Sequence, residues 1–409
     1  MSHRIDRSVS PRTKTTLAAV AAAVAVATIL GMVLLRPTGE RRPNLRGLGF
    51  VNQVVDAEVI EARDVPCQGQ PEAGVACRRV AFHLQEGPDA GSDVVQEFAE
   101  TGTSPRLEAG DSVMLAYDPN APEEFRYRFV DRERSGLILW LALGFAVTVV
   151  ALGRLRGLAA LAGLAASIGV LLWFVLPAVL DGRGPLAVAI VGSAAIAYLA
   201  LYLAHGFTSM TTVALLGTLA SLALTAALAA VFVELAQLTG FASEEAVVVQ
   251  VGAASLDLRG IILGGVVIGA LGAIDDMTVT QASAVWELRA ADPGMPRGTL
   301  TRAGLRIGRD HVASTVNTLA LAYAGASMPI LLLLVLSQQP VGTVISGEVI
   351  ATEVIRTLVG SIGLVAAVPV TTWLAAAVAP GGGGLRPESP PGAHEPARRG
   401  GDGFFDEEE

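Results

Sequence analysis

Two neighbouring carboxylates, Asp275 and Asp276, are the residues of this chain whose chemistry stands out first. They directly follow residues 260–274, a run with no charged side chain. A carboxylate at membrane depth is costly, so it usually faces protein or water and takes part in ion or solute passage. The alternative is structural, with either residue capping a following helix over 277–290. Both roles are compatible with one another.

A second polar group opens a later apolar stretch. Asp310, Ser314 and Asn317 recur at helical spacing and therefore share one helix face. We expect this face to meet the paired carboxylates across a helix bundle, at its inner end. The predicted substrate or ion pathway consists of Asp275, Asp276, Arg309, Asp310 and Asn317. A structural ion pair among these residues is the competing interpretation.

Several other chemistries find no support in the sequence. It contains no P-loop, no GxGxxG after a strand, no HExxH and no GxSxG. The five histidines are scattered, and no basic patch suggests nucleic acid. An aspartyl protease would need a second aspartate inside a facing helix. We therefore expect no enzyme, no cofactor, no metal and no nucleic-acid partner.

The elements that must position these residues are apolar helices. Apolar types make up 52% of the 409 residues and charged types 16%, against roughly 25% charged residues in soluble domains. Eight runs lack Asp, Glu, Lys, Arg and His, and they predict an α-helical polytopic membrane protein of about eight transmembrane helices. These runs are 15–35, 135–153, 157–180, 184–204, 206–233, 260–274, 312–336 and 357–379.

The run 260–274 is too short to cross a bilayer alone. As a helix it spans ~22 Å, whereas the hydrocarbon core is ~30 Å thick. Either Arg259 extends outward to the interface, or the paired carboxylates lie at or just inside the inner boundary. The glycines of this run predict a central, closely packed helix. Residues 277–290 are expected to form an amphipathic helix at the inner interface, with Trp286 as its anchor.

Arginine placement predicts the orientation. Residues 1–14 are basic and are expected in the cytoplasm, followed by a transmembrane anchor helix over 15–35. A cleaved secretory signal is the alternative, but no small-x-small site follows the apolar run. The arginine-rich loop 289–309 is the strongest cytoplasmic signal. The acidic tail, 380–409, is then cytoplasmic and predicted to be disordered, in a protein of the bacterial plasma membrane.

Residues 36–134 are predicted to form a small extracytoplasmic β domain. Short alternating segments recur at 54–60, 80–84, 94–98, 112–117 and 125–130, with turn residues between them. Five such strands suit an OB-like barrel, and a small sandwich is the alternative. Cys67 and Cys77 lie in this domain, where an oxidising compartment favours a disulfide over two free thiols.

Two stretches of the membrane core, 269–288 and 308–334, resemble the signatures of the bacterial YibE/F-like membrane proteins. They read GALGAIDDMTVTQASAVWEL and GRDHVASTVNTLALAYAGASMPILLLL. The resemblance implies an anchor helix, a small external domain and a multi-helix core over 135–379. Asp275 and His311 stand where the family is usually apolar. The family's motif positions fall on Asp276, Glu287, Gly308, Arg309, Asp310 and Asn317.

The family resemblance implies a topology and no defined activity. From the polar positions we expect a transporter or permease for a small solute or ion. A membrane sensor or scaffold, whose external domain binds a ligand or an envelope partner, is the second hypothesis, and an intramembrane enzyme is the third. The expected partners are the lipid bilayer, the solute or ion, and a second copy of the chain or an envelope protein.

Overall fold

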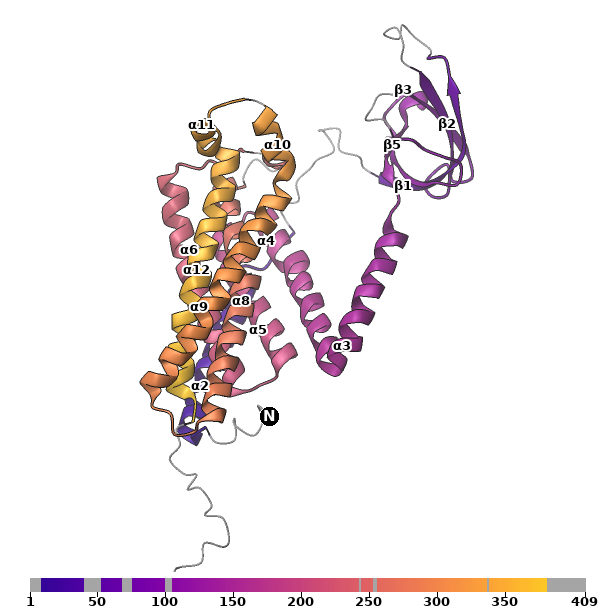
Figure 1. The fold of residues 1–409 in the computed structure, drawn as a ribbon. Helices are drawn as coiled ribbons and strands as arrows, with labels where there is room; N and C mark the ends of the chain where they lie inside the picture. The colour runs from indigo at the N-terminus through magenta and orange to yellow at the C-terminus, as the bar shows by residue number, and fades with distance from the viewer. Residues whose placement is uncertain are drawn as a thin grey trace, which may run out of the picture.

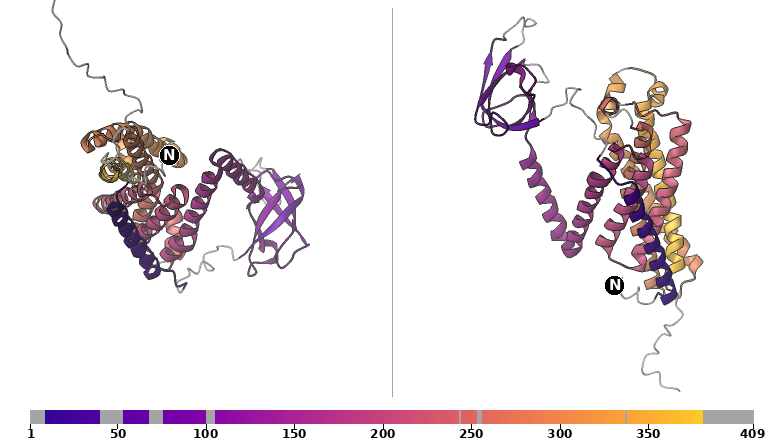
Figure 2. Two further views of the ribbon diagram at one scale, coloured as in Figure 1. Left: turned by 90° about the horizontal axis from the view of Figure 1, so that it is seen from below. Right: turned by 180° about the vertical axis from the view of Figure 1, so that it is seen from behind.

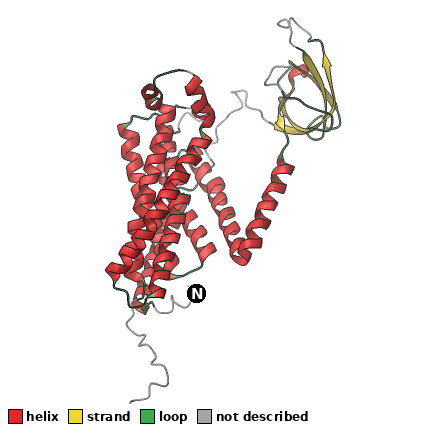
Figure 3. Cartoon of the chain, viewed as in Figure 1, coloured by secondary structure: helices red, strands yellow, loops and turns green. Residues whose placement is uncertain are grey.

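The computed structural model shows a bundle of long helices and a separate N-terminal β half-barrel (Figures 1 and 3). It describes residues 9–39, 53–67, 76–99, 105–242, 244–252, 256–336 and 338–380. The predicted acidic tail therefore lies outside the described residues, apart from Pro380. The mostly helical fold and the N-terminal β domain agree with the predicted fold class.

The β half-barrel contains the five strands that the alternating segments predict. All pairings are antiparallel, in the order β3-β2-β1-β4-β5. Its core consists of the inward side chains of the alternating pattern, among them Val59, Phe82 and Leu115, which are fully buried. The strands are β1 (Gln53–Val65), β2 (Cys77–Leu84), β3 (Asp93–Ala99), β4 (Ser112–Tyr117) and β5 (Tyr127–Arg132).

Side chains tie the two ends of this sheet together. The Gln96 amide of β3 donates to the Tyr127 carbonyl of β5 at 2.9 Å, and its oxygen accepts from the Phe129 N–H at 3.2 Å. The predicted disulfide is confirmed, since Cys67 and Cys77 are bonded to each other. The bond joins the segment after β1 to the first residue of β2 and so links the ends of two paired strands.

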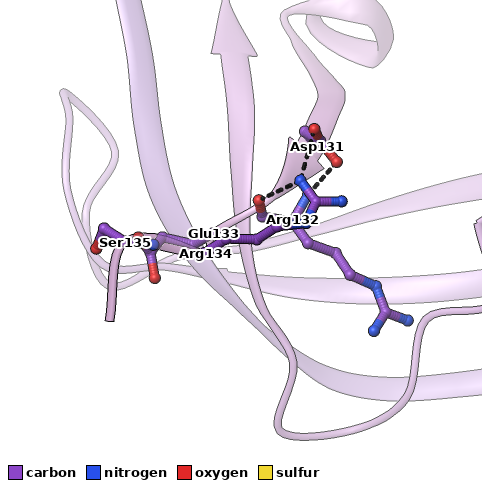
Figure 4. A network of polar contacts seen from close by, with 5 residues as sticks. All are labelled: Asp131, Arg132, Glu133, Arg134 and Ser135. Carbon is purple, nitrogen blue, oxygen red and sulfur yellow. Dashed lines mark hydrogen bonds and ion pairs between the residues drawn. The ribbon is translucent and has the colours of Figure 1, made fainter. Parts of the chain in front are cut away.

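Figure 4 shows the junction at which the half-barrel leads into α3 (Ser135–Val170). Arg134 pairs with Asp131 at 2.8 Å, and this hydrogen bond lowers the pKa of the Asp131 carboxyl. The Glu133 carboxylate accepts from the Ser135 N–H at 2.6 Å, which lowers its pKa as well. A carboxylate at a helix start satisfies a free N–H and complements the helix dipole.

α3 is bent back on itself, and its two arms form the V beside the bundle in Figures 1 and 2. The break lies at Arg154, whose φ of 53° is outside the helical region. A side chain at Gly157 would collide with the Val149 carbonyl, so glycine permits the tight turn. The second arm continues through a π-helical turn (Leu171–Val175) into α4 (Leu176–Leu180). The arms correspond to the predicted runs 135–153 and 157–180.

The bundle contains the remaining long helices. They are α2 (Pro11–Leu34), α5 (Pro185–His205), α6 (Ser209–Leu235), α8 (Leu258–Ala291), α9 (Arg297–Ala326) and α12 (Glu348–Val378). Shorter helices, α7 (Glu244–Gly252), α10 (Met328–Leu336) and α11 (Val341–Ser346), lie between them. By length and composition, six described helices can cross a membrane, or seven when the pair α9 and α10, bent by 65°, counts as one span. That count treats the bent segment Ser135–Leu180 as one helix.

The structure corrects the prediction for residues 258–291. We expected a short span, 260–274, followed by a separate interfacial helix, 277–290, but α8 runs without a break through both. Asp275 and Asp276 are mid-helix residues, so neither caps a following helix. Trp286 is 2% exposed inside the bundle and is not an interfacial anchor. The polar half of α8 is also packed within the bundle, so the helix continues past residue 274 and is long enough to cross a membrane.

The centre of the bundle is formed by α6, α8 and α12, which pack closely along two glycines. A Cβ added at Gly217 would collide with the Thr371 hydroxyl, and one added at Gly363 would collide with the Thr225 hydroxyl. Glycine therefore allows α6 and α12 to approach at both levels. The same levels bring Thr278 and Ile274 of α8 into contact with these helices.

Gly217→Ala tests this close approach. A Gly→Ala change in a helix normally stabilises by about 1 kcal/mol, but here the added methyl collides with Thr371. We expect a net loss of about 1–3 kcal/mol, as for overpacked cores. Gly272→Ala is the matched control, because no atom lies within 4 Å of its added Cβ. Thermal unfolding of the purified protein would contradict the packing described here if both variants were equally stable.

Tyr127 makes the stability of the half-barrel depend on pH. Its hydroxyl donates to Asp89 at 2.8 Å, and burial together with this bond raises the pKa of Tyr127 to about 12. The unfolded phenol titrates near 10, so this stabilisation is complete below pH 10 and is lost as the pH rises to 12. The difference between the absorbance titrations of the wild type and Tyr127→Phe should contain one phenol that ionises near pH 12. A difference that ionises near pH 10 would contradict this assignment.

Candidate functional site

Asp275 is the predicted site residue that lies inside the bundle. It is partly buried on α8, and the Thr218 hydroxyl of α6 donates to its Oδ1 at 3.5 Å. The hydroxyls of Thr218 and Thr278 lie 2.7 Å apart, and Thr278 also donates to the Asp275 carbonyl at 2.9 Å. Both threonines are fully buried. The carboxylate therefore shares a small interior site with hydroxyl groups.

Further hydroxyls continue this site along α6 and α12. Thr218, Ser221 and Thr225 recur at helical spacing and are all buried. Thr371 of α12 is also fully buried, close to Gly217 and Thr278. In the described part of the chain, the hydroxyls of Ser221 and Thr371 have no hydrogen-bond partner. We missed these residues in the sequence, although their helical spacing within an apolar run was a usable signal.

Asp276 points away from this interior site. Its side chain is 69% exposed, and Oδ2 lies 3.8 Å from Nε2 of His311 on α9. That separation is an ion-pair distance and is too long for a hydrogen bond. Adjacent helical residues are rotated by about 100°, so the two carboxylates cannot share one environment here. The structure thus separates the pair that the sequence places together.

The predicted contact between the α9 face and the interior carboxylate is not formed. Asp310, Ser314 and Asn317 do share a face, but all three are exposed on the side of α9 that points away from the bundle, and Arg309 is exposed as well. The buried side of α9 is formed by Leu300, Gly304 and Gly308. Gly304 and Gly308 account for this direction, because a Cβ added at either position would collide with side chains of α8 and α12.

Gln281 joins three helices at the other end of the site. Its side-chain nitrogen donates to the Gly304 carbonyl of α9 at 2.7 Å and to the Thr372 hydroxyl of α12 at 2.6 Å. Gln281 is 2% exposed, so these bonds satisfy a polar group that has little access to water. Two turns later, Arg289 donates to the carbonyls of Pro293 and Met295 and holds the α8–α9 turn.

An ion pair lies between the interior site and the opposite end of α12. Arg356 and Glu353 are 2.6 Å apart, one turn from each other, and both are about a quarter exposed. The Arg356 guanidinium is the nearest group to a Cβ added at Gly265, and the Tyr323 hydroxyl takes the same place at Gly269. Polar groups therefore follow α8 over several turns, on both sides of Asp275.

These features define a class: a bundle of apolar helices that encloses a carboxylate and a row of hydroxyls, joined to a β half-barrel. A family model described as YibE/F-like protein matches residues 141–381. The chain belongs to the YibE/F-like family. Both stretches that resemble the family signatures lie within the matched region. No curated protein and no solved structure matches the chain.

Gln281→Leu tests the polar contact that fastens α9. Leucine has a similar volume but leaves the Gly304 carbonyl and the Thr372 hydroxyl without their donor. We expect a loss of about 1–3 kcal/mol in the free energy of unfolding. Thr280→Val, at an exposed position of the same helix, should change it little. Equal thermal stability of both variants would show that these bonds contribute nothing.

Proposed function

We propose that this protein is a transporter or permease of the bacterial plasma membrane, and that Asp275 binds the proton or small cation that moves with, or as, the solute. The observation that carries the proposal is a carboxylate inside the bundle without a basic partner. Among the described residues, no Arg, Lys or His forms an ion pair with Asp275. The recorded hydrogen bond to its carboxylate comes from the Thr218 hydroxyl, which lies 2.7 Å from the Thr278 hydroxyl.

An uncompensated carboxylate in such a place has two low-energy states. It is either neutralised by a proton or paired with a cation, because a bare buried charge costs several kcal/mol. The Thr218 hydroxyl is a hydrogen-bond donor to the charged carboxylate, and the hydroxyl oxygens of Thr218 and Thr278 can act as ligands for a small cation. Ser221 and Thr371 add two buried hydroxyls at neighbouring levels of the bundle. Loading and unloading of this site is the chemistry that coupled transport requires.

The proposed topology counts eight spans. The two arms of α3 count separately, and α9 with α10 forms one bent span. The start of α2 and the end of α12 then lie on the same side, and Figure 1 places them at the same end of the bundle. The α8–α9 turn lies at this end too, and its arginines support a cytoplasmic location for this end. The β half-barrel is then extracytoplasmic, where the Cys67–Cys77 disulfide is favoured.

A sensor or scaffold is the second candidate, and the half-barrel supplies its supporting observation. An open hollow of about 920 Å³ lies between the β2–β3 turn, with the first residues of β3, and the segment that leads into β5. The charged residues of its lining are mainly acidic, namely Asp89, Asp93, Glu123 and Glu124 beside Arg126. A cationic ligand or partner would fit this surface. Deleting residues 40–130 separates the hypotheses, because a transporter core should retain basal flux and a sensor should lose all function.

Asp275→Asn is the direct test of the transport proposal. In proteoliposomes loaded with a pH-sensitive dye or a sodium indicator, wild-type protein should conduct protons or Na⁺ down an imposed gradient. We expect the variant to lower that flux by about tenfold or more, because asparagine neither titrates nor carries charge. The fold should persist, since the substitution preserves size and removes a buried charge.

Glu234→Gln is the matched control for the loss of one negative charge. Glu234 lies at the exposed end of α6 and pairs with Arg259 at 2.9 Å, outside the proposed site. Its flux should remain near that of the wild type. If Asp275→Asn unfolds like the wild type and conducts both ions equally well, Asp275 is not the coupling residue.

A further inference from the structure

The side of α9 that faces away from the bundle carries a row of polar residues beside the exposed Ile307 and Leu321. Arg306, Asp310, Ser314 and Asn317 follow one another at helical spacing, and each is exposed. In the described residues, no hydrogen bond or ion pair involves the side chains of Arg306, Asp310 or Asn317. We call these four residues the α9 outer face. It is the reverse of the expected pattern, in which lipid-facing helix surfaces are apolar.

The α9 outer face lies at the depth of the membrane core. His311, next to Asp310, pairs with Asp276 in the middle of α8. Leu319 lies beside Gly360 of α12. Asn317 therefore lies near the middle of both helices. Gly363, at almost the same level, contacts Thr225 in the middle of α6. A side-chain amide and a carboxylate at this depth cannot remain in contact with hydrocarbon without a large energetic cost.

We propose that the α9 outer face binds the same face of a second copy of this chain. Two copies in one membrane share orientation, so a two-fold axis normal to the membrane sets their α9 helices side by side and parallel. Asn317 then meets Asn317 of the other copy. An amide both donates and accepts, so identical amides satisfy one another, as a single asparagine does in parallel helix pairs.

Charge complementarity also supports a second copy of the chain as the partner. Arg306 and Asp310 lie one helical turn apart on the α9 outer face, with opposite charges. In a two-fold pair, each arginine reaches the aspartate of the other copy, and the face carries no excess of one sign. Ser314 lies between these residues and Asn317, and the small side chains of Ala313 and Ala324 flank them, so the helices can approach closely. An apolar partner helix would leave all of these groups unsatisfied.

Cysteine cross-linking in native membranes tests this interface. The native cysteines are bonded to each other, so a cysteine at position 317 supplies the only free thiol. We expect mild oxidation of Asn317→Cys to yield a covalent species of twice the chain's mass. Leu224→Cys is the matched control, because Leu224 is 40% exposed near the middle of α6, on another side of the bundle. It should not cross-link.

The mass of the protein in mild detergent gives an independent readout. Wild-type protein should have the mass of two chains, and Asn317→Leu should shift it to one chain while thermal unfolding remains cooperative. A monomeric wild type that does not cross-link at position 317 overturns the proposal. So does cross-linking to a different protein, or a thiol at 317 that reacts with a membrane-impermeant reagent while the protein stays monomeric, which would show a water-filled passage instead.

Discussion

The structure depends on how closely α6 and α12 can approach one another. Gly217 and Gly363 leave room for Thr371 and Thr225, and no larger residue fits at either position without a shift. This contact encloses α8 on two sides and forces its polar half into the bundle. The enclosed groups must then satisfy one another, since water has little access to them. The glycines therefore determine both the packing and the polarity of the interior.

This constraint explains why the length of α8 could not be predicted. A count of uncharged residues measures how well a segment suits lipid, and it ends at Asp275. Gln281 and Thr278 face protein partners on α9, α12 and α6, so their polarity is no obstacle to a long helix. The length of α8 therefore depends on contacts with residues that are distant in sequence, and no local pattern reveals these contacts. The same limit applies to Trp286, which the sequence pattern predicts as an interfacial anchor but whose ring is buried inside the bundle.

Other parts were predictable because their signals are local. The β half-barrel follows from alternation, with each predicted strand segment inside or close to an observed strand. The turn of α3 follows from Arg154 and Arg156, which interrupt two apolar runs. In the site, the shared face of Asp310, Ser314 and Asn317 was predictable from helical spacing. Its direction was not, because direction depends on Gly304 and Gly308, whose importance appears only in three dimensions.

The adjacent carboxylates show how such packing assigns different roles to identical side chains. Asp275 faces α6 and its hydroxyls, whereas Asp276 faces outward beside His311. The family resemblance places Asp276 on a motif position and Asp275 on a usually apolar one. An apolar residue at 275 would leave Thr218 and Thr278 bonded to each other and to the backbone, with the row of hydroxyls intact. The carboxylate thus adds an ionisable group, the one for which we propose proton or cation binding, to an interior that is polar without it.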